Sequence, residues 1–401
     1  MRSLSRNMLI SCWLVVVATA APLAETVYNA AVFPCESRDV MDAQTGVELT
    51  FLTTGASTDT NLYFHDRTWL SDGALILFYS NRNPGGLMGY LAETGELVSF
   101  TTSDGALSGA TAALTGPRFY ALRGNRVLEI TVAIAPSPNP PEQASDVAVS
   151  ERLICVLPSV KNNTALNESC DGARLSVGVR GADTDDKPAI LTIDVAGGAI
   201  HELHRFDDPD TYHFHVQWSR TDPNLLSYAG YPQRLMLIDT RDGVPRNPYR
   251  AWEDELVTHE SWWVKDQLLF CGGIHPKPGE DSHVKVLDIH TGEVRIIGEG
   301  AWWPDGENAE IAKRNWWHAS GSEDGRWVAA DNWHGDIMVF EGKTSRPRLL
   351  TAGHRTYGSG EHPHVGWDRA GKQVVFTSHL LGSPDVCVAT IPQAWQEALA
   401  E

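Results

Sequence analysis

Residues 237–243 read Leu-Ile-Asp-Thr-Arg-Asp-Gly, a short apolar run that ends at an acidic residue and is followed by a glycine. This order indicates a β-strand and then a tight turn, because glycine accepts the positive φ that hairpin turns require. The order recurs along the chain, with its acidic residue at Glu93, Asp194, Asp239, Asp288 and Glu341. The last four positions are 45, 49 and 53 residues apart, and the first gap of 101 residues is about two such units.

A second motif, which begins with Trp and contains turn residues, precedes β-rich segments. Residues 69–73 (WLSDG) and 367–371 (WDRAG) both carry it. Repeats of about 40–50 residues that contain several short strands are typical of propeller blades. A helical period appears only in the tail, at residues 393–401. We therefore predict an all-β, seven-bladed β-propeller, in which residues 25–401 form a single domain.

The first 24 residues have the composition of a secretory signal peptide. Arg2 and Arg6 precede an apolar run at residues 8–21, and small residues follow near its end. This run is shorter than the roughly 20 residues that cross a bilayer, so we expect no membrane span. We expect export to the periplasm or beyond the cell, and a buried N-terminal strand is the alternative.

The charge of the chain excludes some classes of partner. The sequence has 51 acidic and 32 basic residues, a net charge of −19, and removing residues 1–24 would make it −21 by taking away two arginines. Such a surface repels nucleic acids and anionic membranes. An acidic substrate would need a locally basic or metal-bearing pocket. The cysteines form no CxxC motif, although Cys155 and Cys170 could pair in an oxidising compartment.

Five of the fifteen histidines stand near the predicted first strands of successive blades: His215, His259, His318, His362 and His364. Equivalent positions of propeller blades converge on one end of the central channel. If residues 362–364 are extended, the two imidazoles of His-Pro-His point to the same side, and His318 can supply a third nitrogen. Three neutral imidazoles suit Mn²⁺, Zn²⁺, Fe²⁺ or Ni²⁺. A surface pair or a core pair is the alternative for His-x-His.

Tryptophan is concentrated in one part of the chain, since nine of the fourteen lie between Trp252 and Trp333. Packing between blades explains most of them, and one or two at a channel mouth could stack on sugar rings. A serine hydrolase is excluded because the sequence has no Gly-x-Ser-x-Gly motif.

Residues 361–367 (EHPHVGW), 371–378 (GKQVVFTS) and 391–395 (IPQAW) resemble the last blade of the oligogalacturonate lyases, polysaccharide lyase family 22. Residues 258–262 (THESW) are similar to the Thr-His-Glu-Phe-Trp motif of that family. The likeness extends over residues 205–395. Members are seven-bladed propellers that cleave short pectic uronides. The resemblance implies a catalytic base, a catalytic arginine and three manganese ligands, which are His259, Arg234, His318, His362 and His364 respectively.

Two departures from the family pattern affect the expected site. Ser359 stands where the family has a glutamine as the fourth metal ligand, so Ser359 or Glu361 is the candidate for that place. Residues 227–230 (SYAG) replace a Cys-His-Glu-Gly run, which could change the substrate. His215 and Arg67 are candidates for substrate binding, and a structural role is the alternative for each.

These residues suit a metal-dependent β-elimination of oligogalacturonates or related uronic-acid oligosaccharides. His259 would take the C5 proton, and the metal and Arg234 would neutralise the carboxylate. The alternatives are a non-catalytic periplasmic propeller that binds glycans or proteins, and a lyase for a different uronic-acid polymer.

Overall fold

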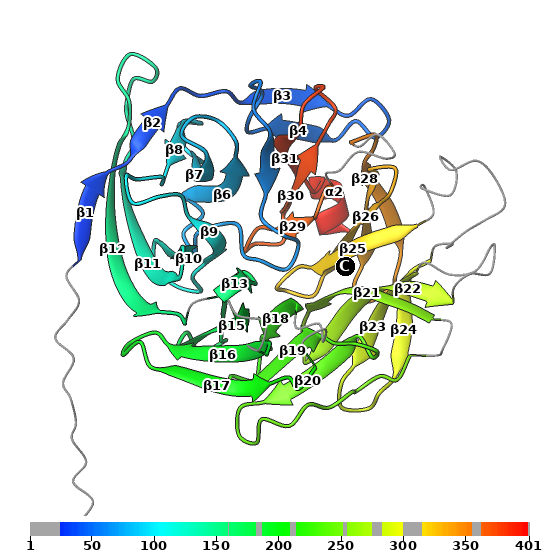
Figure 1. Cartoon of the computed structure of the whole chain (residues 1–401). Helices are drawn as coiled ribbons and strands as arrows, with labels where there is room; N and C mark the ends of the chain where they lie inside the picture. Colours follow the sequence, from blue (N-terminus) through cyan, green and yellow to red (C-terminus); the bar gives the residue numbers. More distant parts are fainter. Residues whose placement is uncertain are drawn as a thin grey trace, which may run out of the picture.

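The computed structural model describes residues 25–158, 160–181, 187–208, 214–251, 255–274, 283–299, 315–354 and 362–399. Their strands form seven antiparallel sheets in a ring, which confirms the predicted seven-bladed β-propeller (Figure 1). The proposed signal peptide, residues 1–24, lies outside the described residues. No helix in the described part of the chain is long and apolar enough to cross a membrane.

The first three blades come from the N-terminal half of the chain. The first contains β2 (Ala31–Phe33), β5 (Asp59–Asn61), β6 (Leu75–Ser80), β7 (Gly86–Leu91) and β8 (Leu97–Ser99). The second contains β1 (Thr26–Asn29), β9 (Ser108–Ala112), β10 (Arg118–Arg123), β11 (Arg126–Ala135) and β12 (Asp146–Val156). The third contains β13 (Val160–Asn163), β14 (Asn167–Glu168), β15 (Arg174–Gly181), β16 (Ala189–Asp194) and β17 (Ile200–Arg205).

The next three blades each use one continuous segment of chain. The fourth contains β18 (Phe214–Trp218), β19 (Leu225–Ala229) and β20 (Leu235–Asp239). The fifth contains β21 (Glu255–Trp262), β22 (Gln267–Ile274), β23 (His283–Asp288) and β24 (Val294–Gly298). The sixth contains β25 (Trp316–Gly321), β26 (Trp327–Asn332), β27 (Ile337–Glu341) and β28 (Pro347–Thr351).

The seventh blade is built from both ends of the chain. C-terminal strands β29 (Gly366–Trp367), β30 (Gln373–Ser378) and β31 (Asp385–Thr390) pair with N-terminal strands β4 (Glu48–Phe51) and β3 (Arg38–Met41). The joining register places Thr50 opposite Val388, and Figure 1 shows the blue strands beside the orange and red ones. The short helix α2 (Gln393–Glu397) follows, within the predicted helical tail.

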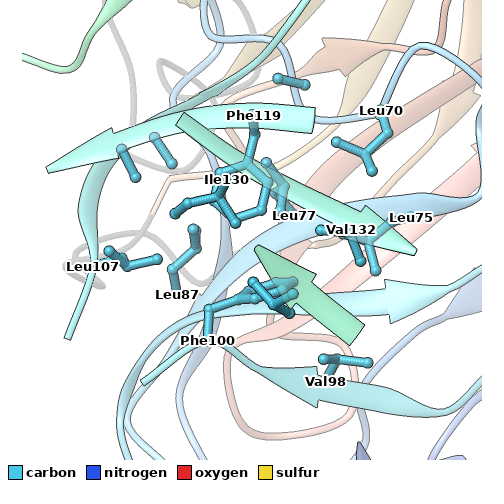
Figure 2. Close-up of a cluster of buried hydrophobic side chains, with 14 of the residues drawn as sticks. Leu70, Leu75, Leu77, Leu87, Val98, Phe100, Leu107, Phe119, Ile130 and Val132 are labelled. Carbon is cyan, nitrogen blue, oxygen red and sulfur yellow. The ribbon is translucent and has the colours of Figure 1, made fainter. Parts of the chain in front are cut away.

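The core lies between neighbouring blades, because each sheet is covered on both faces. Figure 2 shows the cluster between the first two blades, where Leu75, Leu77 and Leu87 of the first pack near Phe119 and Ile130 of the second. This two-sided burial explains why the inner strands are continuous apolar runs, such as Leu-Ile-Leu-Phe in β6.

The acidic–glycine repeats are hairpin turns, as the sequence predicts. Gly95, Gly198, Gly243 and Gly292 all have positive φ, between 64° and 74°. In the fifth turn, after Glu341, Ser345 has the positive φ of 61°, and Gly342 does not. The suggested pairing of Cys155 with Cys170 is not formed, because both thiols are free.

Candidate active site

The central histidines lie on or just before the first strands of the fourth to seventh blades, and these strands line the channel. His215, His259 and His318 lie within β18, β21 and β25, and His364 lies just before β29. In each of these three strands the pairing register shifts at or beside the histidine. Such bulges turn a side chain out of the regular alternation of the strand.

Three of these histidines adopt a backbone conformation that non-glycine residues rarely use. The φ angles of His215, His259 and His364 are 55°, 52° and 53°. A left-handed backbone at a non-glycine residue is unfavourable, and it often occurs where function requires a particular side-chain direction. For residues 362–364, the predicted extended conformation is therefore wrong, since His364 is left-handed and precedes the strand.

Five side chains from five blades form a closed circle around the channel. Ring-centroid distances around the circle are 4.2 Å for His259–His318, 4.4 Å for His318–His364 and 4.8 Å for His364–Tyr63. The circle closes through Tyr63–His215 at 5.3 Å and His215–His259 at 6.2 Å. Tyr63 belongs to the segment after β5, so the first blade contributes to the same site as the fourth to seventh.

The three candidate metal ligands are mutual neighbours within and beside this circle. The imidazole of His362 lies 5.4 Å from His318 and 5.8 Å from His364, between ring centroids. Residues 46 positions apart in sequence therefore meet, as the propeller geometry requires. Ser359 and Glu361, the candidates for a fourth ligand, lie outside the described residues.

Asp331 fixes the orientation of the His318 imidazole. Both carboxylate oxygens of Asp331 lie 3.0 Å from Nδ1 of His318, and one also accepts the backbone N–H of His364 at 3.0 Å. A carboxylate on one ring nitrogen fixes the tautomer that leaves the other nitrogen for a metal. The donor chemistry therefore fits a divalent ion. As they stand, however, no three His, Cys, Asp or Glu side chains among the described residues are arranged as metal ligands.

Glu260 fixes the positions of Arg234 and His215. Its buried carboxylate accepts a hydrogen bond from Nε of Arg234 at 2.9 Å and lies 3.0 Å from Nδ1 of His215. Burial alone would raise the pKa of Glu260, but Arg234 and His215 outweigh it and hold this pKa well below its usual range. Glu260 therefore stays ionised and holds both neighbours in place.

His259 lies between Glu260 and the metal candidates. Burial, together with the neighbouring His318 and His215, lowers the pKa of His259 well below its usual value. The imidazole is therefore neutral near pH 7, which is the form that accepts a proton. Its Nδ1 lies 3.0 Å from the hydroxyl of Thr258, and its ring centroid lies 4.8 Å from that of Trp317.

The structure separates Arg67 from the other predicted site residues. Nη1 of Arg67 lies 3.6 Å from the carboxylate of Glu168. Arg67 lines a cavity whose lining includes none of the other predicted site residues. Sequence reasoning did not identify Tyr63 or Asp331. Tyr63 belongs to no repeat. Asp331 lies within β26, although in the sequence it follows an apolar run, where an acidic residue usually marks a turn. The Glu260 position was visible only as part of the Thr-His-Glu motif.

The fold and the circle of imidazoles define a seven-bladed β-propeller with a histidine-rich site in its channel. No family model and no curated protein matches the sequence. The similar solved structures include an oligogalacturonate lyase in complex with manganese, at 18% identity and a TM-score of 0.72, with 91% of this chain and 98% of that chain covered.

A second oligogalacturonate lyase, from Vibrio parahaemolyticus, is 16% identical with a TM-score of 0.72 and covers 92% of this chain and 100% of that chain. The β-propeller domain of Cps50 from Myceliophteria thermophila is more distant, at 11% identity and a TM-score of 0.50, with 84% and 100% covered. The chain thus has the fold of the oligogalacturonate lyases, which confirms the resemblance seen in the sequence at the level of the fold.

Proposed function

We propose that this protein is a metal-dependent lyase that cleaves oligogalacturonates or related uronic-acid oligosaccharides by β-elimination. The observation that carries the proposal is the convergence of His259, Arg234 and the three metal-type histidines at one place in the channel. The fold shared with two oligogalacturonate lyases supports it.

β-Elimination removes the proton on C5, breaks the bond from C4 to the glycosidic oxygen, and leaves a double bond between C4 and C5. His259, as a neutral imidazole, is the group that takes the C5 proton. Arg234 binds the uronate carboxylate, since a guanidinium matches a carboxylate in two-point geometry. Glu260 keeps Arg234 in that orientation.

His318, His362 and His364 would hold the divalent ion, with Mn²⁺ as the first candidate and Zn²⁺, Fe²⁺ or Ni²⁺ as alternatives. When bound, such an ion supplies a Lewis acid that stabilises the charge developing on the uronate carboxylate. Asp331 orients His318 for this role through its contact with Nδ1.

Tyr63 is the group that we assign to the leaving oxygen. Its ring lies between those of His364 and His215, on the opposite side of the circle from the His259–His318 contact. Burial, and then the charge of Glu260, raises the pKa of Tyr63. The phenol therefore keeps its proton at neutral pH and can donate it to the departing C4 oxygen.

The test is an assay of the purified chain on oligogalacturonates that follows the absorbance of the unsaturated product, before and after chelation and with metal added back. We expect chelation to abolish activity and His259→Ala to lower kcat by about 10²-fold or more. His201→Ala, at an exposed histidine of β17, is the matched control and should keep full activity.

Two other outcomes would replace the proposal. Tight binding of oligogalacturonate without any unsaturated product would support a non-catalytic glycan-binding propeller. Activity only on another uronic-acid polymer in a substrate panel would keep the lyase chemistry and change the substrate. Export through residues 1–24 is part of the proposal and is tested by N-terminal sequencing of the protein from the periplasm.

A further inference from the structure

A cavity lies in the channel next to the circle of imidazoles, and His65 of its lining lies 5.1 Å from His215, between ring centroids. Its volume is 290 Å³, and its lining includes Trp218 and Trp262, the last residues of β18 and β21. The histidines of the circle lie earlier on those strands, at positions 215 and 259. Because the first strands of all blades run in the same direction, this cavity lies toward the other end of the channel.

The cavity gathers positive charge in a strongly acidic protein. Arg67, Arg220 and Lys265 line it, and Glu323 is the acidic residue in the lining. Glu323 already lies 3.5 Å from Arg369, so its charge is shared with a third arginine. The carboxylate of Asp266, the residue after Lys265, accepts hydrogen bonds from the hydroxyl groups of Ser219 and Thr221 and contacts His290.

Arg220 has donor groups that the protein leaves unused. It donates one hydrogen bond, from Nη1 to the carbonyl of Gly321 at 3.1 Å. Within the described ranges, no carboxylate lies within 4.0 Å of its guanidinium. The side chain is accessible to water in the cavity, yet protein surrounds it, and this desolvation lowers the pKa of Arg220 to about 10.

Arg67 has an unmet donor beside the same cavity. Its Nη2 donates to the carbonyl of Glu168 at 3.2 Å, whereas the buried Nη1 has no hydrogen-bond partner in the described structure. The Glu168 carboxylate, 3.6 Å from Nη1, instead accepts the backbone N–H of Leu114 at 2.7 Å. Because Nη1 is buried, Arg67 contributes positive charge to the wall of the cavity, partly balanced by Glu168, and not a direct hydrogen bond to a ligand.

We propose that this cavity binds a small carboxylate-bearing molecule, up to the size of one sugar acid. Arg220 supplies the N–H groups that match a carboxylate, Arg67 and Lys265 add positive charge, and tryptophan residues supply an apolar wall. The volume of 290 Å³ is at the lower end for small-molecule sites, so a single ring fits better than an oligosaccharide. The proposal is independent of the lyase function, because it uses none of the residues in the circle.

The experiment is isothermal titration calorimetry of the full chain with galacturonate, galactose and inorganic phosphate. We expect galacturonate to bind, galactose to bind at least about tenfold more weakly, and phosphate to bind more weakly than galacturonate. Arg220→Gln should weaken galacturonate binding by about tenfold or more, as expected for a charge-assisted contact. Arg220→Lys should weaken it less.

Two further variants assign the binding to this cavity. Arg246→Gln removes the same charge from an exposed turn and should leave the affinity unchanged. Arg234 lies beside the circle, with Nη2 3.2 Å from Nδ1 of His215. Arg234→Gln should therefore leave the galacturonate binding that depends on Arg220 unchanged. Thermal melting checks that each variant is folded, and Arg220→Lys carries the test if Arg220→Gln is not.

The proposal is overturned if the wild-type chain binds no galacturonate, or if Arg220→Gln and Arg220→Lys both bind it like wild type. Loss of all binding in Arg234→Gln alone would place the ligand in the circle instead. Tighter binding of phosphate than of galacturonate would overturn the carboxylate class.

Discussion

Glu260 is a buried carboxylate whose two partners, Arg234 and His215, face the proposed substrate site. Glu260→Gln keeps the size of the side chain and removes the charge that orients Arg234. We expect a loss of about tenfold to 10²-fold in kcat/KM on oligogalacturonates, carried mainly by kcat, because misplaced catalytic groups cost transition-state stabilisation. Steady-state kinetics check this expectation.

A purely structural role for Glu260 would give a different pattern. The thermal midpoint would fall while the remaining folded enzyme kept its kcat per active site. Active-site titration alongside the kinetics separates the two results, and unchanged kcat in Glu260→Gln would contradict the positioning role.

His354 makes the stability of the protein depend on pH. It is buried and contacts the hydroxyl groups of Thr351 and Ser378 at 2.6 and 2.8 Å, and burial lowers its pKa from 6.5 to about 4. The unfolded chain therefore takes up this proton at a higher pH than the folded chain. The contribution to stability is complete above pH 6.5 and is lost as pH falls toward 4.

We expect the free energy of unfolding to fall by about 3 kcal/mol from this residue between pH 6.5 and 4. His354→Gln should remove that part of the pH dependence, because glutamine does not titrate. Urea unfolding at several pH values measures the slope for both proteins. Parallel curves for wild type and His354→Gln would show that His354 does not cause the dependence.

Single residues show what the sequence could and could not predict about the site. The family motifs identified His259, Arg234 and the three metal candidates, which the fold brings together. Asp331 was missed because its importance comes from contacts with His318 and His364, and only the folded ring creates these contacts. Tyr63 was missed because its segment lies outside both the repeat and the motif-bearing half.

At the level of strands, the packing between the fifth and sixth blades requires a glycine. A Cβ on Gly321, at the end of β25, would lie 2.1 Å from Cδ1 of Trp263. Trp263 cannot easily move, since it is buried and its indole N–H donates to the carbonyl of Ser322 at 3.1 Å. The fifth and sixth blades therefore pack so closely at Gly321 that a larger residue does not fit against Trp263.

Gly321→Ala should therefore destabilise the fold by about 1–3 kcal/mol, the usual cost of overpacking. Gly197→Ala is the matched control, because a Cβ there meets nothing within 4 Å. Its effect should stay within about 0.5 kcal/mol. Chemical denaturation compares the two variants, and equal midpoints for both would contradict the packing argument.

The strands also show which local features the repeats predict and which they do not. Acidic–glycine turns predicted the hairpins because turn chemistry is local, and Gly95, Gly243 and Gly292 have the required φ. Bulges depend on the pairing register between two strands, which composition does not reveal. The left-handed backbone at His215 and His259 was therefore not predictable from alternation.

For the whole molecule, closure of the ring depends on β3 and β4, which complete the seventh blade. Strands β1 and β2 only add outer strands to the second and first blades. A chain that begins at residue 34 should therefore melt cooperatively, within a few degrees of the full chain. A chain that begins at residue 52 should lose the cooperative transition or melt far lower.

Circular dichroism melting and gel filtration compare the two truncated chains. Equal midpoints would show that the ring does not need its N-terminal closing strands. Sequence spacing predicted seven blades, but this composite blade was not predictable. Its two parts are separated by almost the entire chain. Residues 38–51 carry the acidic–glycine turn at Asp42 and Gly46, but the turn alone does not show that β4 pairs with β31.

The composite blade also sets an order of events during synthesis. Thr50 leaves the ribosome 338 residues before its partner Val388. At about 5–20 residues per second, the delay is roughly 20–70 seconds. During that interval β4 has β3 on one edge, but Leu49 and Phe51, both fully buried in the finished protein, lack the pairing with β31 on the other edge. The nascent chain therefore exposes the unpaired edge of β4 and its apolar side chains for most of its translation. We expect a holding chaperone to bind this segment during that time.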